Sequence, residues 1–158
     1  MRPSLRGMRF LCLMAVLLLP VFLAGPPARA ADPAAVAKLH GGIVDCVGCD
    51  LTGADLTNTC VKEHDLHGAR FDGANATLMC MSFANFTNAS FRNTDLSGAN
   101  LAGAKMDGAD LTGAKTSITS FLGTDLRQVK GLTQPQIDMA CGDAKTRLPP
   151  GLKVHTCQ

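Results

Sequence analysis

Residues 49–128 read, five at a time, CDLTG ADLTN TCVKE HDLHG ARFDG ANATL MCMSF ANFTN ASFRN TDLSG ANLAG AKMDG ADLTG AKTSI TSFLG TDLRQ. One pattern recurs sixteen times without a change of register. A typical unit has a large apolar centre, a small residue two places before it, and usually Asp or Asn directly before it, as in Ala54-Asp55-Leu56. Fourteen of the sixteen centres are bulky and apolar, and the exceptions are Ala76 and Thr116.

The five-residue period fits neither regular secondary structure. An α-helix repeats every ~3.6 residues and a strand every ~2, so neither would keep these centres on one face. A unit this short cannot bury its apolar residue alone and does so by stacking on its neighbours. The repeat therefore predicts a solenoid.

The Ala-(Asp/Asn)-Leu units, such as Ala99-Asn100-Leu101 and Ala109-Asp110-Leu111, closely resemble the pentapeptide-repeat family. The resemblance implies an all-β fold, a right-handed quadrilateral β-helix with four pentapeptides in each coil. It also implies that the centre and the residue two before it point inward and the other three outward. Residues 49–128 then make about four coils.

Twenty residues per coil place residues twenty apart above one another, ~4.8 Å apart as in hydrogen-bonded strands. The inner ladders are then Leu51, Phe71, Phe91 and Leu111; Leu66, Phe86, Met106 and Leu126; and the poorly filled Leu56, Ala76, Leu96 and Thr116. His64 and Met79 occupy inward positions that usually hold Ala. We therefore expect local distortion at both.

The N-terminal segment 1–30 has the pattern of a secretory signal peptide. Arg2, Arg6 and Arg9 precede an apolar run from Phe10 to Gly25, and Ala28-Arg29-Ala30 is typical of a cleavage site. An uncleaved membrane anchor is the alternative, although the apolar run is short for a spanning helix, which needs ~20 residues. The sequence predicts a periplasmic or secreted protein, cleaved after Ala30, with no membrane contact afterwards.

Removal of this segment changes the charge balance. The whole chain has 15 basic and 13 acidic residues, and four Arg lie in the segment, so 11 basic residues remain and the net charge becomes −2. Neither a basic nor a strongly acidic surface is indicated, and we expect no nucleic-acid binding. Some relatives resemble DNA through an acidic surface and act on topoisomerases, a role that a nearly neutral exported chain fits poorly.

Short helices are expected on both sides of the repeat. Asp32 is suited to cap a helix that runs to His40, with Pro33 in its first turn and Gly41-Gly42 at its end. A second helix is predicted from Gln134 to Cys141, capped by Thr133 and closed by Gly142, with Leu132, Ile137 and Met139 contacting the last coil. Both helices would cover open coil ends, which otherwise invite stacking with other chains.

The predicted organisation has four parts: a signal peptide (1–30), an N-terminal capping helix and lip (31–48), the repeat (49–128), and a C-terminal helix with a disulfide-closed tail (129–158). The tail contains Gly131-Leu132-Thr133-Gln134 and Ala140-Cys141-Gly142-Asp143. In these stretches it resembles an extension of exported proteobacterial members of the family.

Six cysteines remain after the expected cleavage, an even count that points to disulfides in an oxidising compartment. Cys60 and Cys80 lie twenty residues apart, both directly before a centre, so they should face outward from adjacent coils at a distance a disulfide accepts. Cys141 would pair with Cys157 and tie the tail back. Cys46 and Cys49 would form the third pair at the N-terminal lip.

The same cysteines allow a second interpretation. Cys46-x-x-Cys49 is also typical of a redox pair or half of a metal site, which Cys60, His64, His67 or Cys80 would complete. Cys60 has a better partner in Cys80, and His64 should point inward while His67 points outward. Thiol-redox chemistry also favours a first Cys at the start of a helix, where its thiol pKa is lowered, whereas Asp50-Leu51 begins a coil of the solenoid. Disulfides are therefore preferred, and no metal or cofactor is predicted.

Other catalytic motifs are absent from the sequence. Each Asp before a centre occupies a position where the repeat ordinarily has Asp or Asn, which favours corner-bonding or solvated carboxylates over acid–base catalysis. No Gly-x-Ser-x-Gly, His-Glu-x-x-His or phosphate-binding loop occurs. We expect a chain that is not an enzyme.

One outward side carries apolar residues where Gly, Asn or charged residues appear elsewhere. Ala102 and Leu122 lie on the third side of the coils, and Leu78, Phe83 and Ile118 lie at its bordering corners. Contiguous apolar surface often marks a protein contact, although a terminal segment covering these residues, or isolated exposure without a role, remains open. The sequence predicts a structural or protein-interaction module whose partner is an unknown protein or a second copy. The alternative is a metal-binding or thiol-redox protein that uses Cys46 and Cys49.

Overall fold

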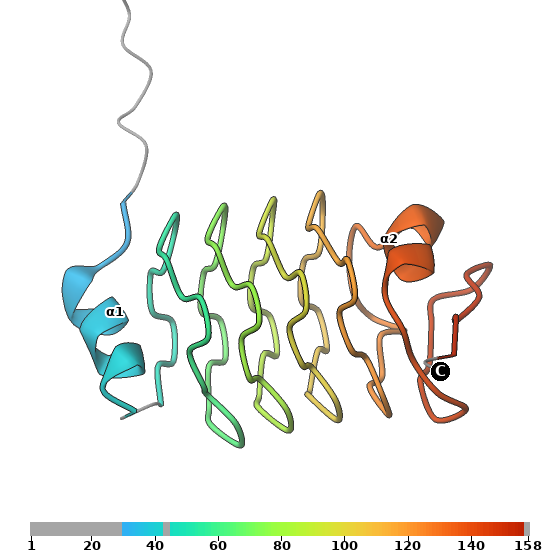
Figure 1. The fold of residues 1–158 in the computed structure, drawn as a ribbon, viewed down its shortest axis with the longest axis horizontal. Coiled ribbons are helices and arrows are strands. Elements are labelled where there is room, and N and C mark those ends of the chain that lie inside the picture. Colours follow the sequence, from blue (N-terminus) through green and yellow to red (C-terminus); the bar gives the residue numbers. More distant parts are fainter. Residues whose placement is uncertain (1–29, 43–44, 157–158) are drawn as a thin grey trace, which may run out of the picture.

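The computed structural model describes residues 30–42 and 45–156. The predicted signal peptide therefore lies almost entirely outside the described residues. Figure 1 shows a row of stacked coils, with α1 (Pro33–His40) at one end and α2 (Gln134–Met139) toward the other. Within the described ranges, the β-structure consists of single parallel bridges rather than longer strands. The architecture is a solenoid.

Each repeat unit is a short extended piece followed by a turn. The C=O of a centre accepts a hydrogen bond from the N–H three residues later, as from Ala54 to Leu51 (3.1 Å). The N–H of the centre donates to the neighbouring coil, as from Leu51 to the C=O of Arg70 (2.7 Å). The second residue after a centre usually has a positive φ, as at Gly53 (68°) and Asn58 (57°), which is why Gly and Asn recur there. One extended piece and one turn account for the period of five.

The coils stack in a register of twenty residues. Parallel bridges join residues twenty apart from Asp50–Arg70 to Asp110–Lys130. The prediction that such residues are vertical neighbours is therefore confirmed. Beyond Lys130 the offset increases, because α2 occupies part of the next turn of the chain: Ser120 pairs with Cys141, and Asp125 pairs with Arg147.

The core is a column of unit centres. All sixteen centres are buried. The rings of Phe71 and Phe91 stack with centroids 4.7 Å apart, and Phe86 packs edge-on against both. At the poorly filled ladder, Thr116 is buried and its hydroxyl donates to the C=O of Gln136 in α2 (2.7 Å). The column of centres is therefore closed at this ladder by a polar contact with α2.

Two expectations about inward positions are wrong. Met79 is completely buried, and its neighbour Cys80 keeps regular bridges to Cys60 and Asn100, so no distortion occurs there. His64 does not lie in the core: its side chain is 40% exposed, and its Nδ1 lies 3.4 Å from Asp45 Oδ1. A core column this narrow has no room for an imidazole that also needs polar partners.

The first helix matches its prediction. Asp32 precedes α1, and its side chain accepts a hydrogen bond from the Ala34 N–H (2.9 Å). Pro33 is the first helical residue, and Gly41 follows the last. Ala35 and Leu39 are buried in the common core, so α1 packs its apolar face on the first coil.

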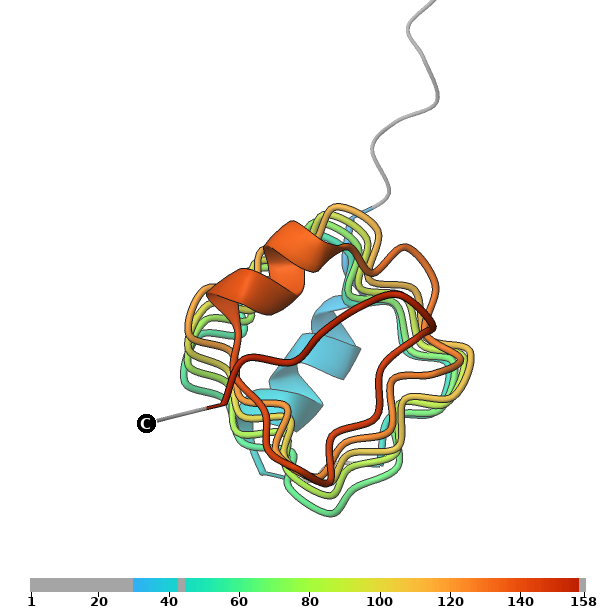
Figure 2. The ribbon, with the colours of Figure 1, turned by 90° about the vertical axis from the view of Figure 1, so that its right-hand side faces the viewer.

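The second helix is shorter than predicted. It ends at Met139 rather than Cys141, because Cys141 enters a bridge with Ser120. Ile137 is buried and Leu132 packs partly against the core, whereas the Met139 side chain is 59% exposed and Met139 meets the last coil through its C=O, which accepts a hydrogen bond from the Ile118 N–H. In the view along the coils, α1 and the C-terminal segment both lie across their outline (Figure 2).

The two helices have eight and six residues. Neither helix of the described ranges reaches the length and apolar character that crossing a bilayer requires.

Candidate interaction surface

The third side is the side of the solenoid made of residues 78–83, 98–103 and 118–123. Bridges from Cys80 to Asn100 and from Asn100 to Ser120 stack these three segments. One bordering corner has Leu78, Gly98 and Ile118, and the other has Phe83, Gly103 and Gly123. The third side is therefore made of three stacked extended segments between two corners.

Three large apolar side chains stand out from the corners of this side. Leu78 and Phe83 are each 60% exposed, and Ile118 is 81% exposed. All three have positive φ, at 56°, 60° and 58° respectively. Between the corners, Leu122 is 37% exposed and Ala102 is half-buried. The structure thus brings the five predicted patch residues onto one side, while their role in a contact stays a prediction.

Leu78 and Phe83 lean on glycines of the next coil. Leu78 Cδ2 lies 2.7 Å from the place a Cβ would take at Gly98, and Phe83 Cδ1 lies 2.6 Å from the corresponding place at Gly103. Each apolar side chain therefore rests on bare backbone. A larger residue at Gly98 would displace the Leu78 side chain, and one at Gly103 would displace the Phe83 side chain.

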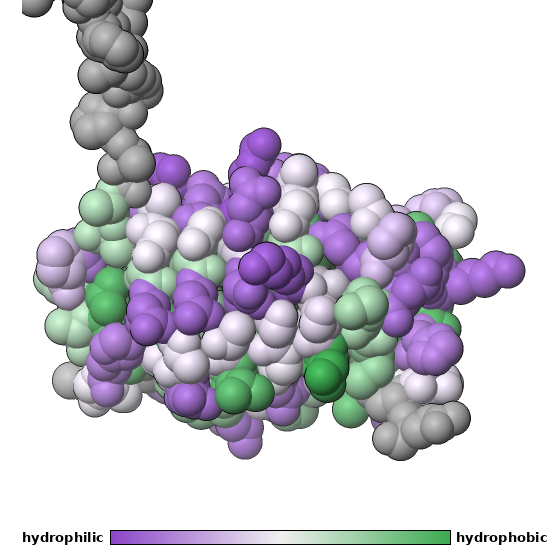
Figure 3. Space-filling model, turned by 45° about the horizontal axis from the view of Figure 1, so that its top comes forward, coloured by the Kyte–Doolittle hydropathy of each residue, from purple (hydrophilic) through white to green (hydrophobic). Residues whose placement is uncertain are grey.

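The third side carries no charge. Its three segments, LMCMSF, GANLAG and ITSFLG, contain no Asp, Glu, Lys or Arg. Charged residues occur in the adjoining coils at its two ends: Lys62 and Glu63, 3.2 Å apart, at one end, and Asp143 with Lys145 at the other. On the face drawn in Figure 3, hydrophilic residues predominate and hydrophobic ones form separate areas.

A hollow opens beside Ile118. It has a volume of about 360 Å³ and lies between Ile118, Met139 and His155. The Ile118 N–H donates to the C=O of Met139 (2.7 Å), which holds the C-terminal end of α2 against this corner. Met139 was not predicted as part of the patch. Met139 is exposed here because α2 ends there rather than at Cys141, and no residue pattern in the sequence predicts that earlier end.

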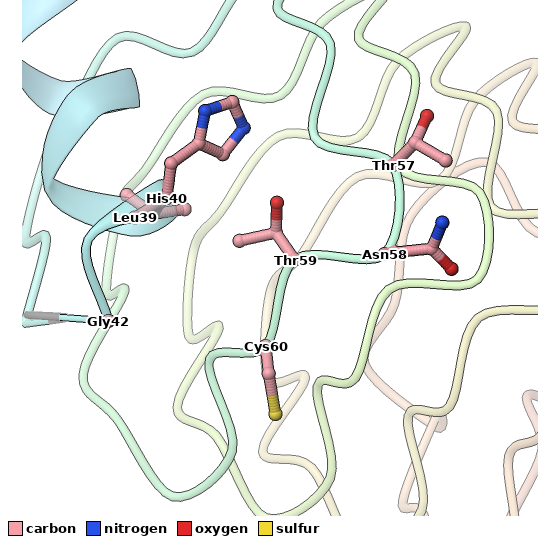
Figure 4. A pocket seen from close by; sticks show the side chains of 7 residues that line it. All are labelled: Leu39, His40, Gly42, Thr57, Asn58, Thr59 and Cys60. Carbon is pink, nitrogen blue, oxygen red and sulfur yellow. The ribbon is translucent and has the colours of Figure 1, made fainter.

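A second hollow of about 350 Å³ lies where α1 meets the first coil. Figure 4 shows His40 facing the side chains of Thr57 and Thr59, while the Cys60 side chain points away from them. His40 Nε2 lies 3.2 Å from the C=O of Asp55. This contact attaches the last residue of α1 to the coil, and the hollow presents no pair of groups arranged for catalysis.

Two cysteine pairs lie at disulfide distance. Cys46 and Cys49 are joined, with Cα atoms 5.3 Å apart, and Cys60 and Cys80 are joined across adjacent coils, with Cα atoms 4.4 Å apart. The Cys60–Cys80 pair lies at the edge of the third side. Cys157 is outside the described residues, so its pairing with Cys141 stays a prediction. The chain before it runs beside Cys141, because Gly142 forms a bridge with Thr156.

The residues of the alternative metal site do not come together. His64 contacts Asp45, His67 is exposed, and both cysteine pairs are closed on themselves. In the part of the chain that the structure describes, no group of three or more His, Cys, Asp or Glu side chains is arranged to hold a metal ion.

The carboxylates before the centres bind their own corners. Asp55 Oδ1 accepts hydrogen bonds from the Thr57 hydroxyl (2.6 Å) and N–H (3.2 Å), and Asp95 binds Ser97 in the same way. These side-chain hydrogen bonds are the main cause that lowers the pKa of both carboxyl groups. The prediction of corner-bonding carboxylates is confirmed for these residues, and a carboxyl group held as an anion is a poor general acid.

A sequence profile described as pentapeptide repeats matches residues 45–79 and 80–115, with eight copies. No curated protein matches the chain. Among solved structures, the chain is similar to a pentapeptide repeat protein (Rfr23) from the cyanobacterium Cyanothece 51142, with 27% identity over 63% of this chain, 64% of that chain, and a TM-score of 0.51. The chain thus covers less than two thirds of that protein. This likeness identifies the solenoid as a right-handed quadrilateral β-helix.

Two further structures are similar at lower scores. A pentapeptide repeat protein from Nostoc Pcc 7120 has 24% identity, covers 75% of this chain and 97% of that chain, and has a TM-score of 0.40. QnrB1, a plasmid-mediated fluoroquinolone resistance protein, has 19% identity, covers 68% and 58% of the two chains, and has a TM-score of 0.37.

Proposed function

Because residues 45–115 belong to the pentapeptide-repeat family, we propose that this chain is an exported, non-enzymatic interaction module that binds a protein through its third side. On this proposal the solenoid holds the binding residues rigidly, and the two helices with the C-terminal segment close its ends. The module contributes a surface and no reaction.

One observation carries the proposal: Leu78, Phe83 and Ile118 are exposed at corners where the backbone favours Gly or Asn. A positive φ costs a bulky or β-branched residue on the order of 1 kcal/mol. Leu78 and Phe83 recover part of this cost by packing on Gly98 and Gly103, but most of each side chain remains in water, and Ile118 is 81% exposed. A contact with another protein would bury this remaining apolar surface.

Export is supported by the first thirty residues and by the cysteines. Arg2, Arg6 and Arg9, the apolar run and Ala28-Arg29-Ala30 lie outside the described residues or at their edge, so this argument stands on sequence pattern alone. Two cysteine pairs at disulfide distance fit an oxidising compartment such as the periplasm or the cell exterior.

A thiol-redox or metal role for Cys46 and Cys49 has less support. Cys46 is only 2% exposed, and within the described residues no group of three or more His, Cys, Asp or Glu side chains is arranged to hold a metal ion. Thiol chemistry and metal binding both need an accessible thiolate. The N-terminal pair fits a structural role, in which it fixes the turn from Cys46 to Cys49 at the start of the first coil.

The test uses the purified protein, immobilised and incubated with an extract of the compartment to which it is exported. The variant Leu78→Asn/Phe83→Asn/Ile118→Asn places at each corner a residue that already occupies corners at positions 58, 88 and 93. We expect the wild-type protein to capture at least one protein, identified by mass spectrometry, that the variant does not retain. Equal capture by both, with an unchanged circular-dichroism spectrum, would remove the third side as the binding surface.

A control variant keeps this test specific. Val47 is 59% exposed and lies outside the third side, so Val47→Asn removes exposed apolar surface elsewhere. We expect it to capture the same proteins as the wild type.

A further inference from the structure

We propose that the partner of the third side is a second copy of this chain, and that the two solenoids pair side by side with their axes antiparallel. This inference rests on the proposed function, since it names the occupant of the same surface. In this arrangement, Leu78 of each copy sits at the corner of Ile118 and Met139 in the other.

Shape supports a self-complementary contact. The protruding Leu78 and Phe83 lie toward the N-terminal end of the third side, and the hollow of about 360 Å³ beside Ile118 and Met139 lies toward its C-terminal end. Positions 78 and 118 are separated by two coils, or ~9.6 Å at the usual strand spacing. A two-fold axis across the side brings a protruding residue of each copy to the hollow of the other, so one contact forms twice.

Charge supports the same partner. Near a two-fold axis each residue meets its own copy, so any charge there would face a like charge. The third side has no charged residue in its three segments, whereas the neighbouring side at 93–97 and 113–117 carries Asp95 and Lys115. The antiparallel orientation also brings Lys62 and Glu63 of one copy toward Asp143 and Lys145 of the other. Each charge at the ends then has an opposite charge to approach.

The ends of the solenoid offer no competing contact among the described residues. The Asp32 N–H donates to the C=O of Asp50 at the first coil (2.8 Å), and the Gly142 N–H donates to the C=O of His155 at the last (2.8 Å). At each end, the chain itself thus occupies a backbone group that could otherwise pair with another coil.

The corner conformation makes the test independent of folding. Asn adopts a positive φ more readily than Leu or Ile, so Leu78→Asn/Ile118→Asn is expected to remain folded, with the circular-dichroism spectrum of the wild type. Mass is measured by sedimentation equilibrium on the purified protein at roughly 100 µM, where a micromolar Kd would populate the dimer. We expect a dimer for the wild type and for Val47→Asn. We expect at least a tenfold weaker association for the double variant.

A charge pair tests the orientation. Leu78→Glu should abolish dimerisation alone, because it brings a carboxylate to a hollow that Asp138 lines, and Ile118→Lys should do so because it places a charge against Leu78 of the other copy. Together they should restore it, because the antiparallel arrangement sets residue 78 of one copy against residue 118 of the other. Two monomeric single variants whose combination also stays monomeric, with melting temperatures near that of the wild type, would overturn the antiparallel register.

Two other outcomes separate this inference from the proposed function. A wild-type protein that is monomeric at this concentration overturns the second copy as partner, and the proposed function still stands if a different captured protein depends on the third side. Unchanged mass together with unchanged capture in the corner variants overturns both.

Discussion

Gly131 is the residue at which the stack of coils is least able to accept a side chain. It has a φ of 68°, and a Cβ there would lie 2.7 Å from the Cα of Thr112 and would also collide with the Thr112 hydroxyl. Gly123 has a nearly equal φ of 65° but has no atom within 4 Å of its Cβ position. The two glycines therefore separate the cost of backbone conformation from the cost of crowding.

We predict that Gly131→Ala destabilises the protein more than Gly123→Ala does. Both variants force an L-residue into the left-handed region, at about 1–2 kcal/mol. Gly131→Ala adds crowding against backbone, which costs a further ~1–3 kcal/mol. Urea unfolding followed by circular dichroism measures both values. Equal losses in the two variants would show that the backbone of Thr112 moves away at little cost.

At the scale of an element, the Gln136 side chain makes four of the hydrogen bonds that fix the start of α2 and join it to the last coil. Gln136 Oε1 accepts hydrogen bonds from the Thr133 N–H (2.9 Å) and hydroxyl (2.8 Å) at the start of the helix. Its Nε2 donates to the C=O of Leu111 (2.8 Å) and of Ala114 (3.0 Å). A helix of six residues is not stable alone in water, so its position depends on such contacts.

We predict that Gln136→Ala lowers the free energy of unfolding by about 1–3 kcal/mol, because several hydrogen bonds are lost and two partly buried carbonyl groups lose a partner. Limited proteolysis should also cut first near α2 in this variant. Asp138→Ala is the matched control on the same helix: Asp138 is exposed and accepts one hydrogen bond, from Gln134, so we expect a change within ~0.5 kcal/mol. Similar losses in both variants would contradict the role given to Gln136.

At the scale of the whole molecule, the repeated carboxylates make stability depend on pH. Side-chain hydrogen bonds lower the pKa of Asp55, Asp95 and Asp125, chiefly from Thr57, Ser97 and Arg127 respectively. A carboxyl group whose pKa is lower in the folded than in the unfolded chain stabilises the fold above the unfolded value, near 4. That contribution to stability is lost as the pH falls through the lower pKa that the carboxyl group has in the folded chain.

We therefore predict a melting temperature that is nearly constant between about pH 7 and pH 5 and falls below about pH 4. Differential scanning calorimetry across this range tests the prediction. In Asp95→Asn the decline should be shallower, since an amide keeps the corner bond without titrating, as Asn75 does with Thr77. A melting temperature that rises on acidification would refute the assignment.

The proposed self-association also concerns the whole molecule, because it depends on one side of the solenoid and on both of its ends. The charge-free third side lies between charged coil segments, and the chain itself occupies backbone groups at both ends. The mass measurements proposed above therefore report on the whole solenoid rather than on one corner.

The repeat could be predicted from sequence because its rule is local. One apolar centre and one turn in every five residues mark the unit, and the resemblance to the pentapeptide-repeat family implies four units in each coil. Together they predict the stacking of Cys60 on Cys80 and the inward Phe71, Phe86 and Phe91, which the structure shows. The capping of α1 was predictable for the same reason, since Asp32 and Pro33 act within one turn.

The positions that do not follow the five-residue repeat could be placed only from the tertiary structure. His64 turns outward because Asp45, nineteen residues earlier, is there to meet it. Met139 is exposed because Cys141 pairs with Ser120 and ends α2 early. The hollow beside Ile118 exists only where α2, the last coil and the C-terminal segment converge.

Sequence by itself determined the five-residue unit, the order of the coils and the residues that fill the column, because each depends on interactions within one turn or at a constant separation of twenty residues. Only the tertiary structure decided how α2 and the tail meet the last coil, and which apolar side chains there are left in water. Those contacts join segments without a constant separation, so no period in the sequence records them.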